Sequence, residues 1–255
     1  MMRAALALVV LVACSTSNKD FPTRPPGNPN GGLNGTPAPG GVDGGVGPIG
    51  DGGIVINGRV CVVHDLRNPT DCDDTVDISH AKVLLGNRTT TATLTKLGEF
   101  AITAGFGSDL VWRATLVNYI TTVMPFGIDA TIPIVPEALY QELLEMNSPT
   151  SPNAGQGSVL VRVLNDSVPQ VGVTATTNLT DQGLTSLPFY DEDNSATDWN
   201  PAGATQKAGL IWIPVADATT SPRQVNVKPM GATTAVTLDV EVEAQSLTFV
   251  THDLK

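Results

Sequence analysis

The stretch GRVCVVHD, residues 58–65, alternates apolar and polar positions around Val60 and Val62, and this pattern predicts a β-strand with one buried face. A second stretch of this kind, GSVLVRVLND, starts at Gly157. When the two stretches are aligned on their leading glycines, both carry valine at the third and fifth positions. The alignment predicts that the same strand occurs twice in the chain.

The repetition continues in the same order after each of these strands. A polar turn and a second strand come first, then a glycine-led strand, and then a further alternating strand. The second strands are HAKVLLG and QVGVTAT, and the glycine-led strands are residues 98–102 and 209–213. The further alternating strands are VWRATLV and RQVNVKP. Short antiparallel strands of this kind build sandwich folds. We therefore predict two tandem antiparallel β-sandwich modules, residues 54–135 and 155–255.

The segment VPEALYQELLEMNSP between the two modules predicts one short helix, followed by a linker, over residues 136–154. Pro136 suits the first helical position. The apolar residues Ala138, Leu139, Leu143, Leu144 and Met146 fall at near-helical spacing. We expect this stripe to pack across the module junction, and the alternative is that it binds a partner.

Composition agrees with an all-β fold, because charged residues make up only 15% of the chain while β-branched residues and turn formers are abundant. The formal net charge is −11, and removal of residues 1–13, which contain only Arg3 as a charged group, would make it −12. Such a surface repels nucleic acids and anionic lipid headgroups, so we predict no nucleic-acid partner.

The N-terminus has the composition of a secretory signal peptide, residues 1–13. Arg3 precedes an apolar run at residues 4–13 that is about half as long as a membrane-spanning helix. Glycine and proline then dominate up to residue 53, and few large apolar side chains are available for burial. Residues 14–53 are therefore predicted to be a disordered tether.

The four residues LVAC at 11–14 resemble the lipobox of bacterial lipoproteins. The resemblance implies that the thiol of Cys14 carries diacylglycerol and that cleavage occurs before Cys14. Several acyl chains on one residue anchor a protein stably to a membrane. Ser15 in place of aspartate resembles the outer-membrane sorting pattern. The resemblance thus implies a lipid-anchored protein of the cell envelope, at the outer membrane.

The first module resembles the carboxypeptidase regulatory-like, transthyretin-like β-sandwich family. The matching positions are Gly58, Val60, Ala81, Val83, Leu85, Thr89 to Thr91, Gly98, Phe100 and Ile102. The second module matches more loosely at Gly157, Val159, Val173, Thr205, Gly209 and Ile211. The resemblance implies an Ig-like or transthyretin-like sandwich and carries no catalytic residue. An insert at residues 65–77 and a long acidic loop in the second module depart from the family pattern.

The segment CVVHDLRNPTDCDDTVDISH contains Cys61, His64, Cys72 and His80, which together suggest a zinc site. Strand geometry opposes it, because Cys61 and His64 are three residues apart and face opposite sides of a regular strand. A Cys61–Cys72 disulfide is the simpler interpretation in an exported chain, and free thiols are the third. The nearby acids Asp71, Asp73, Asp74 and Asp77 match no calcium-loop spacing, so we predict no metal and no cofactor.

The loop at residues 178–205 places aromatic residues among acids. Its candidate binding residues are Tyr190, Asp191, Asp193, Asp198 and Trp199. Aromatics among carboxylates suit a sugar platform or a calcium-assisted binding loop. The alternative is that Tyr190 and Trp199 pack the loop onto the sheet while the acids keep it soluble.

No motif of nucleophilic, metal-dependent or nucleotide chemistry occurs in the chain, so no catalytic residue is predicted. We expect a non-catalytic, lipid-anchored envelope protein that displays β-sandwich modules for binding, adhesion or structural support. Its expected partners are the membrane and an envelope protein or polysaccharide. The alternative is an accessory subunit or cryptic hydrolase that acts on envelope polysaccharide or peptide.

Overall fold

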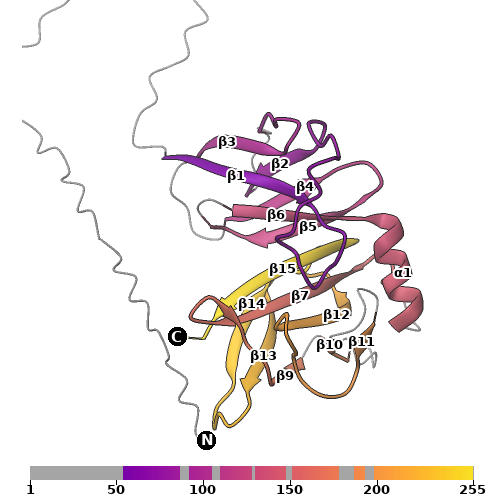
Figure 1. The fold of residues 1–255 in the computed structure, drawn as a ribbon, viewed down its shortest axis with the longest axis vertical. Coiled ribbons are helices and arrows are strands. Elements are labelled where there is room, and N and C mark those ends of the chain that lie inside the picture. Colours follow the sequence, from indigo (N-terminus) through magenta and orange to yellow (C-terminus); the bar gives the residue numbers. More distant parts are fainter. Residues whose placement is uncertain are drawn as a thin grey trace, which may run out of the picture. The chain divides into compact units, whose positions relative to one another are not determined.

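In the computed structural model the regular secondary structure is β-strand apart from one short helix, which confirms the all-β prediction (Figure 1). It describes residues 54–86, 92–104, 110–127, 130–147, 151–177, 187–192 and 198–254, all within the unit Pro48–Lys255. Cys14 and the segments predicted as signal peptide and tether, residues 1–53, lie outside the described residues. One helix occurs in the described ranges, and none there is long and apolar enough to cross a membrane.

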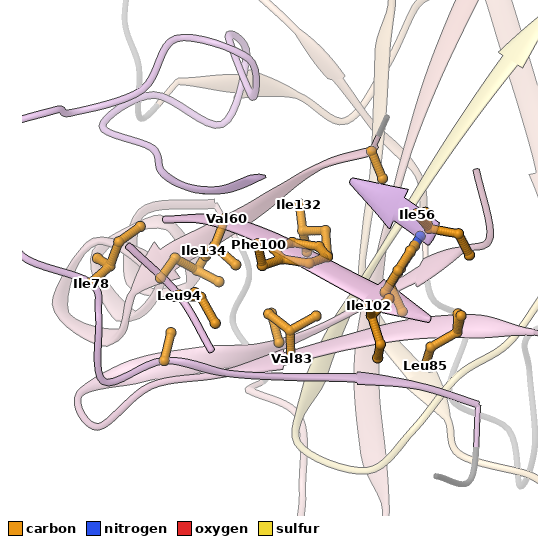
Figure 2. Close-up of a cluster of buried hydrophobic side chains, with 14 of the residues drawn as sticks. Ile56, Val60, Ile78, Val83, Leu85, Leu94, Phe100, Ile102, Ile132 and Ile134 are labelled. Atoms are coloured by element: carbon orange, nitrogen blue, oxygen red, sulfur yellow. The ribbon is translucent and has the colours of Figure 1, made fainter. Parts of the chain in front are cut away.

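Six strands form the N-terminal half of the described fold. They are β1 (Ile54–Val62), β2 (Lys82–Leu85), β3 (Glu99–Ala104), β4 (Val111–Thr115), β5 (Tyr119–Pro125) and β6 (Ala130–Pro136). β1 pairs antiparallel with β3 and parallel with β6, while β4 pairs antiparallel with β2 and β5. Alternate side chains of these strands bury one apolar cluster, in which Val60, Phe100 and Ile132 meet (Figure 2).

Nine strands form the C-terminal half. They are β7 (Gln156–Asn165), β8 (Val168–Pro169), β9 (Val173–Thr177), β10 (Phe189–Asp191), β11 (Trp199–Asn200), β12 (Leu210–Asp217), β13 (Arg223–Pro229), β14 (Val236–Val240) and β15 (Ser246–Asp253). The order β11-β10-β12-β7-β15 belongs to one sheet, and β14-β13-β9 forms another. A second apolar cluster contains residues from both, among them Val161 of β7 and Val225 of β13.

The strand pairing around β1 recurs around β7. Each pairs antiparallel with a glycine-led strand, β3 or β12, and parallel with the last strand of its half, β6 or β15. The amide of Val60 donates to the carbonyl of Gly98 at 2.9 Å, and the amide of Val163 donates to the carbonyl of Gly209 at 2.8 Å. Val60 therefore corresponds to Val163 and not to Val159, so the alignment on the leading glycines is wrong by four residues.

The two glycines at these equivalent turns are required by backbone geometry. Gly98 has a φ of +81° and Gly209 a φ of +66°. A methyl group on Gly98 would lie 2.4 Å from the carbonyl oxygen of Val60, and one on Gly209 would lie 2.6 Å from that of Val163. Only glycine combines this backbone conformation with such a close approach of the neighbouring strand.

Backbone pairing also joins the two halves. β15 pairs parallel with β5 from Ser246 opposite Thr121 to Thr248 opposite Val123, in addition to its pairing with β7. The strand order therefore runs without a break from β11 to β3 through both halves. Sequence patterns did not indicate this pairing.

The predicted helix is α1 (Glu137–Asn147), which directly follows β6, so Pro136 ends the strand and precedes the helix. Its buried residues are Tyr140, Leu143 and Leu144. Ala138 and Met146, which the sequence assigned to the apolar stripe, are exposed, and the Met146 side chain is 55% accessible. Tyr140 takes their place because it lies one turn before Leu144 on the buried face.

Candidate functional site

A third apolar cluster brings together the two regions that the sequence singled out. We call it the junction core, and it consists of Cys61, Val63, Leu66, Val135, Tyr140, Leu143, Leu144, Leu160, Phe189, Trp199, Leu210, Trp212, Leu247 and Phe249. The residues come from β1 and the segment after it, β6, α1 and the sheet of the C-terminal half. Leu66 of the insert is completely buried in this cluster. The insert therefore packs against both halves of the fold.

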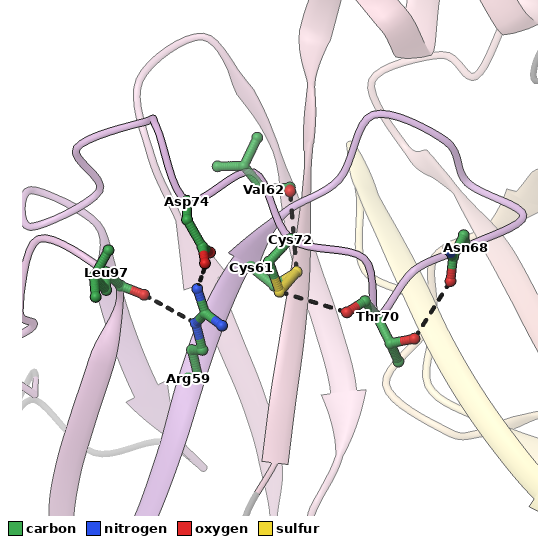
Figure 3. The surroundings of a disulfide bond; sticks show 8 residues. All are labelled: Arg59, Cys61, Val62, Asn68, Thr70, Cys72, Asp74 and Leu97. Carbon is green, nitrogen blue, oxygen red and sulfur yellow. Dashed lines mark hydrogen bonds and ion pairs between the residues drawn. A yellow bond between two sulfur atoms is a disulfide. The ribbon is translucent and has the colours of Figure 1, made fainter.

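The two cysteines hold the insert at the end of β1 (Figure 3). The sulfur atoms of Cys61 and Cys72 are 2.09 Å apart, which is disulfide distance. Val63 and Cys72 form an isolated antiparallel bridge, and the amide of Asp73 donates to the carbonyl of Val62 at 2.9 Å. The chain that leaves β1 thus returns to the same strand, with Leu66 between the two attachment points.

The polar residues of the insert shape its turns. Asp73 accepts from the amide of Thr75 at 2.9 Å and from its hydroxyl at 2.6 Å, and Asp77 accepts in the same way from Ser79. These hydrogen bonds from Thr75 and Ser79 lower the pKa of Asp73 and of Asp77. Asp73 and Asp77 therefore fix the local backbone of this segment.

Of the two histidines in the suggested zinc site, His64 points to an acid and not to the cysteines. Nε2 of His64 lies 3.0 Å from a carboxylate oxygen of Asp73, and the His64 side chain is 71% exposed. Within the described ranges, no group of three or more His, Cys, Asp or Glu side chains is placed to hold a metal ion. The cysteine pair is instead occupied at disulfide distance.

Mass spectrometry of the intact protein is expected to show one bridge between Cys61 and Cys72. Replacing both by alanine should lower the free energy of unfolding by about 2.5–3 kcal/mol, because the unfolded chain regains the entropy of a short loop. The measurement is denaturant unfolding with and without reductant, and reductant should not affect the double variant. Two freely alkylated thiols in the folded wild type would contradict the disulfide.

Arg67 links the insert to the acidic loop of the C-terminal half. Its guanidinium group pairs with the carboxylate of Asp65 at 3.0 Å, and Nη1 donates to the carbonyl oxygen of Glu192 at 2.6 Å. The Arg67 side chain is only 14% exposed, so these bonds are shielded from water. The two sequence candidates, insert and loop, are therefore in direct contact.

Asp191 of the predicted binding loop is a buried structural acid with 1% exposure. Its carboxylate accepts three backbone hydrogen bonds, from Gln206 at 2.9 Å, from Ala208 at 2.7 Å and from Leu210 at 3.0 Å. These amides belong to the turn that contains Gly209 and leads into β12. Asp191 thus holds that turn against β10, and its oxygens face the protein backbone.

The aromatic residues of the same loop are buried as well. Tyr190 accepts a hydrogen bond from the amide of Ala175 at 2.9 Å, and burial raises the pKa of its phenol. The ring of Trp199 lies 5.6 Å from that of Trp212, and the Trp199 amide donates to the Asn147 side chain at 3.0 Å. This arrangement favours the packing role over an open sugar platform. Asp198 is exposed, and Asp193 lies outside the described residues.

Comparisons with known proteins assign no family to the chain. No protein-family model matches it, and no curated protein matches it. Among solved structures, it is similar to the Bacillus anthracis TIE protein, at 9% sequence identity, over 79% of this chain and 33% of that one, with a TM-score of 0.22. The chain thus spans about a third of that protein, and a likeness of this strength carries no argument about function.

Tyr140 connects α1 to the sheet of the C-terminal half by a buried hydrogen-bond chain. Its hydroxyl group contacts the hydroxyl of Ser158, which in turn donates to the carbonyl of Pro214. Burial raises the pKa of Tyr140 to about 12, against an ordinary value of 10.0. The phenol therefore stays neutral in the folded protein at a pH where the unfolded chain already ionises.

This difference predicts a stability loss in alkaline solution. Below about pH 10 both states hold the proton, and between about pH 10 and pH 12 only the unfolded state releases it, so the stability should fall over that range. We expect Tyr140 to account for about 2 kcal/mol of the fall. Denaturant unfolding of Tyr140→Phe at a series of pH values should show a correspondingly shallower fall. Parallel curves for Tyr140→Phe and wild type would contradict the assignment.

Proposed function

We propose that this chain is a non-catalytic, lipid-anchored protein of the cell envelope that displays two tandem β-sandwich modules for binding, adhesion or structural support. The observation that carries the proposal is that side chains which could bind a ligand or react are instead used in packing. Asp191 holds a turn, Tyr190 and Trp199 are buried, and the Cys61–Cys72 pair fixes an insert. A chain whose acids and aromatics are engaged in this way suits a scaffold better than a catalyst.

The recurring strand arrangement supports the tandem modules. The glycine turns at residues 98 and 209, and the parallel pairing of first and last strands in each half, suit two copies of one Ig-like or transthyretin-like sandwich. Continuous pairing of β5 with β15 and the junction core would hold the two copies as one stiff body. A stiff body at the end of a Gly- and Pro-rich segment suits display at a distance from a membrane.

The lipid anchor is tested at Cys14. Cys14→Ser is expected to abolish incorporation of radiolabelled palmitate and to leave unprocessed precursor, because lipid attachment and cleavage both depend on that thiol. The matched control is Ser15→Ala, which should be labelled and processed as the wild type is. Normal processing and membrane partition of Cys14→Ser would rule out the lipoprotein assignment.

The display role is tested by affinity capture from envelope extract, with full-length protein in mild detergent as bait. We expect retention of an envelope protein or polysaccharide without its breakdown. Release of shortened glycan or peptide fragments from the extract would instead support the alternative, an accessory subunit or hydrolase. That outcome would contradict the non-catalytic assignment.

A further inference from the structure

A pocket lies beside α1, at the end of the fold where β5 and β15 begin to pair. It has a volume of about 260 Å³ and is lined by residues of β5, of α1, of the segment that leads into β7, and of the turn before β15. The pairing of β5 with β15 starts at its edge, with Ser246 opposite Thr121. Pockets that enclose a whole drug-sized ligand have volumes of roughly 300–1,000 Å³. This space, which we call the helix pocket, therefore suits one small unit of a larger ligand.

The walls of the helix pocket are fixed by hydrogen bonds on two sides. On one side, the buried contact between the hydroxyl groups of Tyr140 and Ser158 seats α1 against β7. On the other side, the amide of Gln245 donates to the carbonyl of Gln156 at 2.7 Å, which holds the turn before β15 against β7. The pocket is therefore already formed in the folded chain, as small-ligand sites usually are.

The lining of the helix pocket is polar but carries little charge. Amide groups come from Gln141 of α1 and from Gln245 of the turn. Hydroxyl groups come from Tyr119 and Thr121 of β5. None of these four side chains forms a hydrogen bond or an ion pair with another described residue. Among the described residues that line the pocket, Glu137 alone is charged at neutral pH, so the pocket offers mainly uncharged donors and acceptors.

Apolar surface lies among these polar groups. Leu144 and the ring of Tyr140 are buried, and Pro152 is half-buried. A sugar ring carries hydroxyl groups around its edge and C–H bonds on its faces. It therefore needs a surface that combines uncharged hydrogen-bonding groups with apolar area, as the lining of the helix pocket does.

The backbone of Gln245 adopts a conformation that favours glycine, with a φ of +55°. Residues with side chains rarely occupy this region, and those that do are concentrated at binding and active sites. The Gln245 side chain is exposed and forms no hydrogen bond within the described part of the chain, so the fold does not use it. A ligand in the helix pocket would use it.

We propose that the helix pocket binds one uncharged sugar unit of an envelope polysaccharide. The amides of Gln141 and Gln245 bind hydroxyl groups of the unit, while its C–H face packs on Leu144 and the neighbouring apolar surface. Acidic sugars are disfavoured, because Glu137 and the net charge of −11 repel them. The inference rests on the proposed display function and names the chemistry of the displayed protein's ligand.

The test uses full-length protein in mild detergent and calorimetric titrations with hexasaccharides. The neutral probes are those of glucose, mannose, galactose and N-acetylglucosamine, and the acidic probe is that of galacturonic acid. We expect at least one neutral hexasaccharide to bind at least about tenfold more tightly than the acidic one. Gln141→Ala and Gln245→Gly should each weaken this binding about fivefold, because each removes a hydrogen-bonding group from the pocket.

Each variant has a matched control. Glu142→Ala changes an exposed residue of α1 that does not line the pocket, and Ser167→Gly relaxes a φ of +66° in a turn that does not line it. Both controls should bind the sugar as the wild type does. Alanine favours the helix at residue 141 and glycine suits the backbone at residue 245, so neither variant is expected to unfold the chain. Thermal unfolding of all four proteins checks this.

Three results would overturn the proposal. They are a lack of binding by every neutral hexasaccharide, binding that both pocket variants leave unchanged, and equal weakening in the controls. Tighter binding of the acidic hexasaccharide would also overturn it, because the pocket has no cationic side chain among its described lining residues. Failure of sugar binding leaves the palmitate labelling of Cys14 and the capture of an envelope protein unaffected, so the two proposals fail separately.

Discussion

Replacing Asp191 by alanine is expected to lower the free energy of unfolding by about 3–5 kcal/mol, since each unpaired buried amide costs about 1–3 kcal/mol. The carboxylate is buried, and it accepts from the amides of Gln206, Ala208 and Leu210. Alanine would leave these three donors without their acceptor, in one buried hydrogen bond from Leu210 and two partly buried ones from Gln206 and Ala208. Asp191→Asn keeps the shape and one acceptor oxygen but loses the charge, so its loss should be intermediate. Denaturant unfolding measures all three proteins.

The control for this prediction is Asp198→Ala in the same loop. Asp198 is exposed, so its replacement should change the stability by no more than about 0.5 kcal/mol. Calcium separates the packing role from a binding role, because a calcium site filled at a hundred times its dissociation constant would add about 2.7 kcal/mol. We expect no such gain. A calcium-dependent rise in the unfolding temperature that Asp191→Ala abolishes would contradict the structural role.

Local features of the fold could be predicted from the sequence because they follow from short-range rules. The alternation around Val60 predicted the strand that became β1, and the spacing of Leu143 and Leu144 predicted α1. Strand geometry argued against a zinc site, because His64 had to face away from Cys61, and a Cys61–Cys72 disulfide was then a simpler interpretation than free thiols. The structure places His64 toward Asp73, at the exposed edge of the insert.

Pairing between distant strands could not be predicted in the same way. The parallel contact of β15 with β5 and the parallel pairing of β1 with β6 join segments whose own patterns do not specify a neighbour. The four-residue error in the alignment of Val60 has a related cause. Side chains alternate with a period of two, so a shift by four residues keeps every valine on the same face of the strand.

The role of the acidic loop depended on burial, which its composition concealed. Asp191 belongs to a run of acids that suggests a solvated surface, yet the glycine turn at residue 209 supplies three amides that need an acceptor. Leu66 is similar, because it is a single leucine in a polar insert with no apolar neighbour in sequence to reveal its burial. Leu66 acquires its role from the opposite half of the fold, and Asp191 acquires its role from a turn that lies 15 to 19 residues away in its own half.

Leu66→Ala is expected to lower the free energy of unfolding by about 2–5 kcal/mol, the usual cost of removing a fully buried leucine side chain and leaving a cavity. Leu66 has no exposed surface, and in the junction core it is grouped with Trp212 and Phe249 of the C-terminal half. The matched control is Leu97→Ala in the same half, because that side chain is 47% exposed and should cost much less. Denaturant unfolding measures both variants.

The coupling of Leu66 to the disulfide gives this prediction a second, independent readout. The Cys61–Cys72 pair closes the segment that contains Leu66, so without it the ordering of this segment costs more chain entropy and Leu66 is held less firmly in the junction core. The effects of Leu66→Ala and of the double cysteine variant should therefore not add, and a double-mutant cycle should give a coupling of about 0.5–3 kcal/mol. Additive effects would mean that the insert stays seated without its covalent tie. A cost for Leu66→Ala no larger than for Leu97→Ala would show that the insert does not join the two halves.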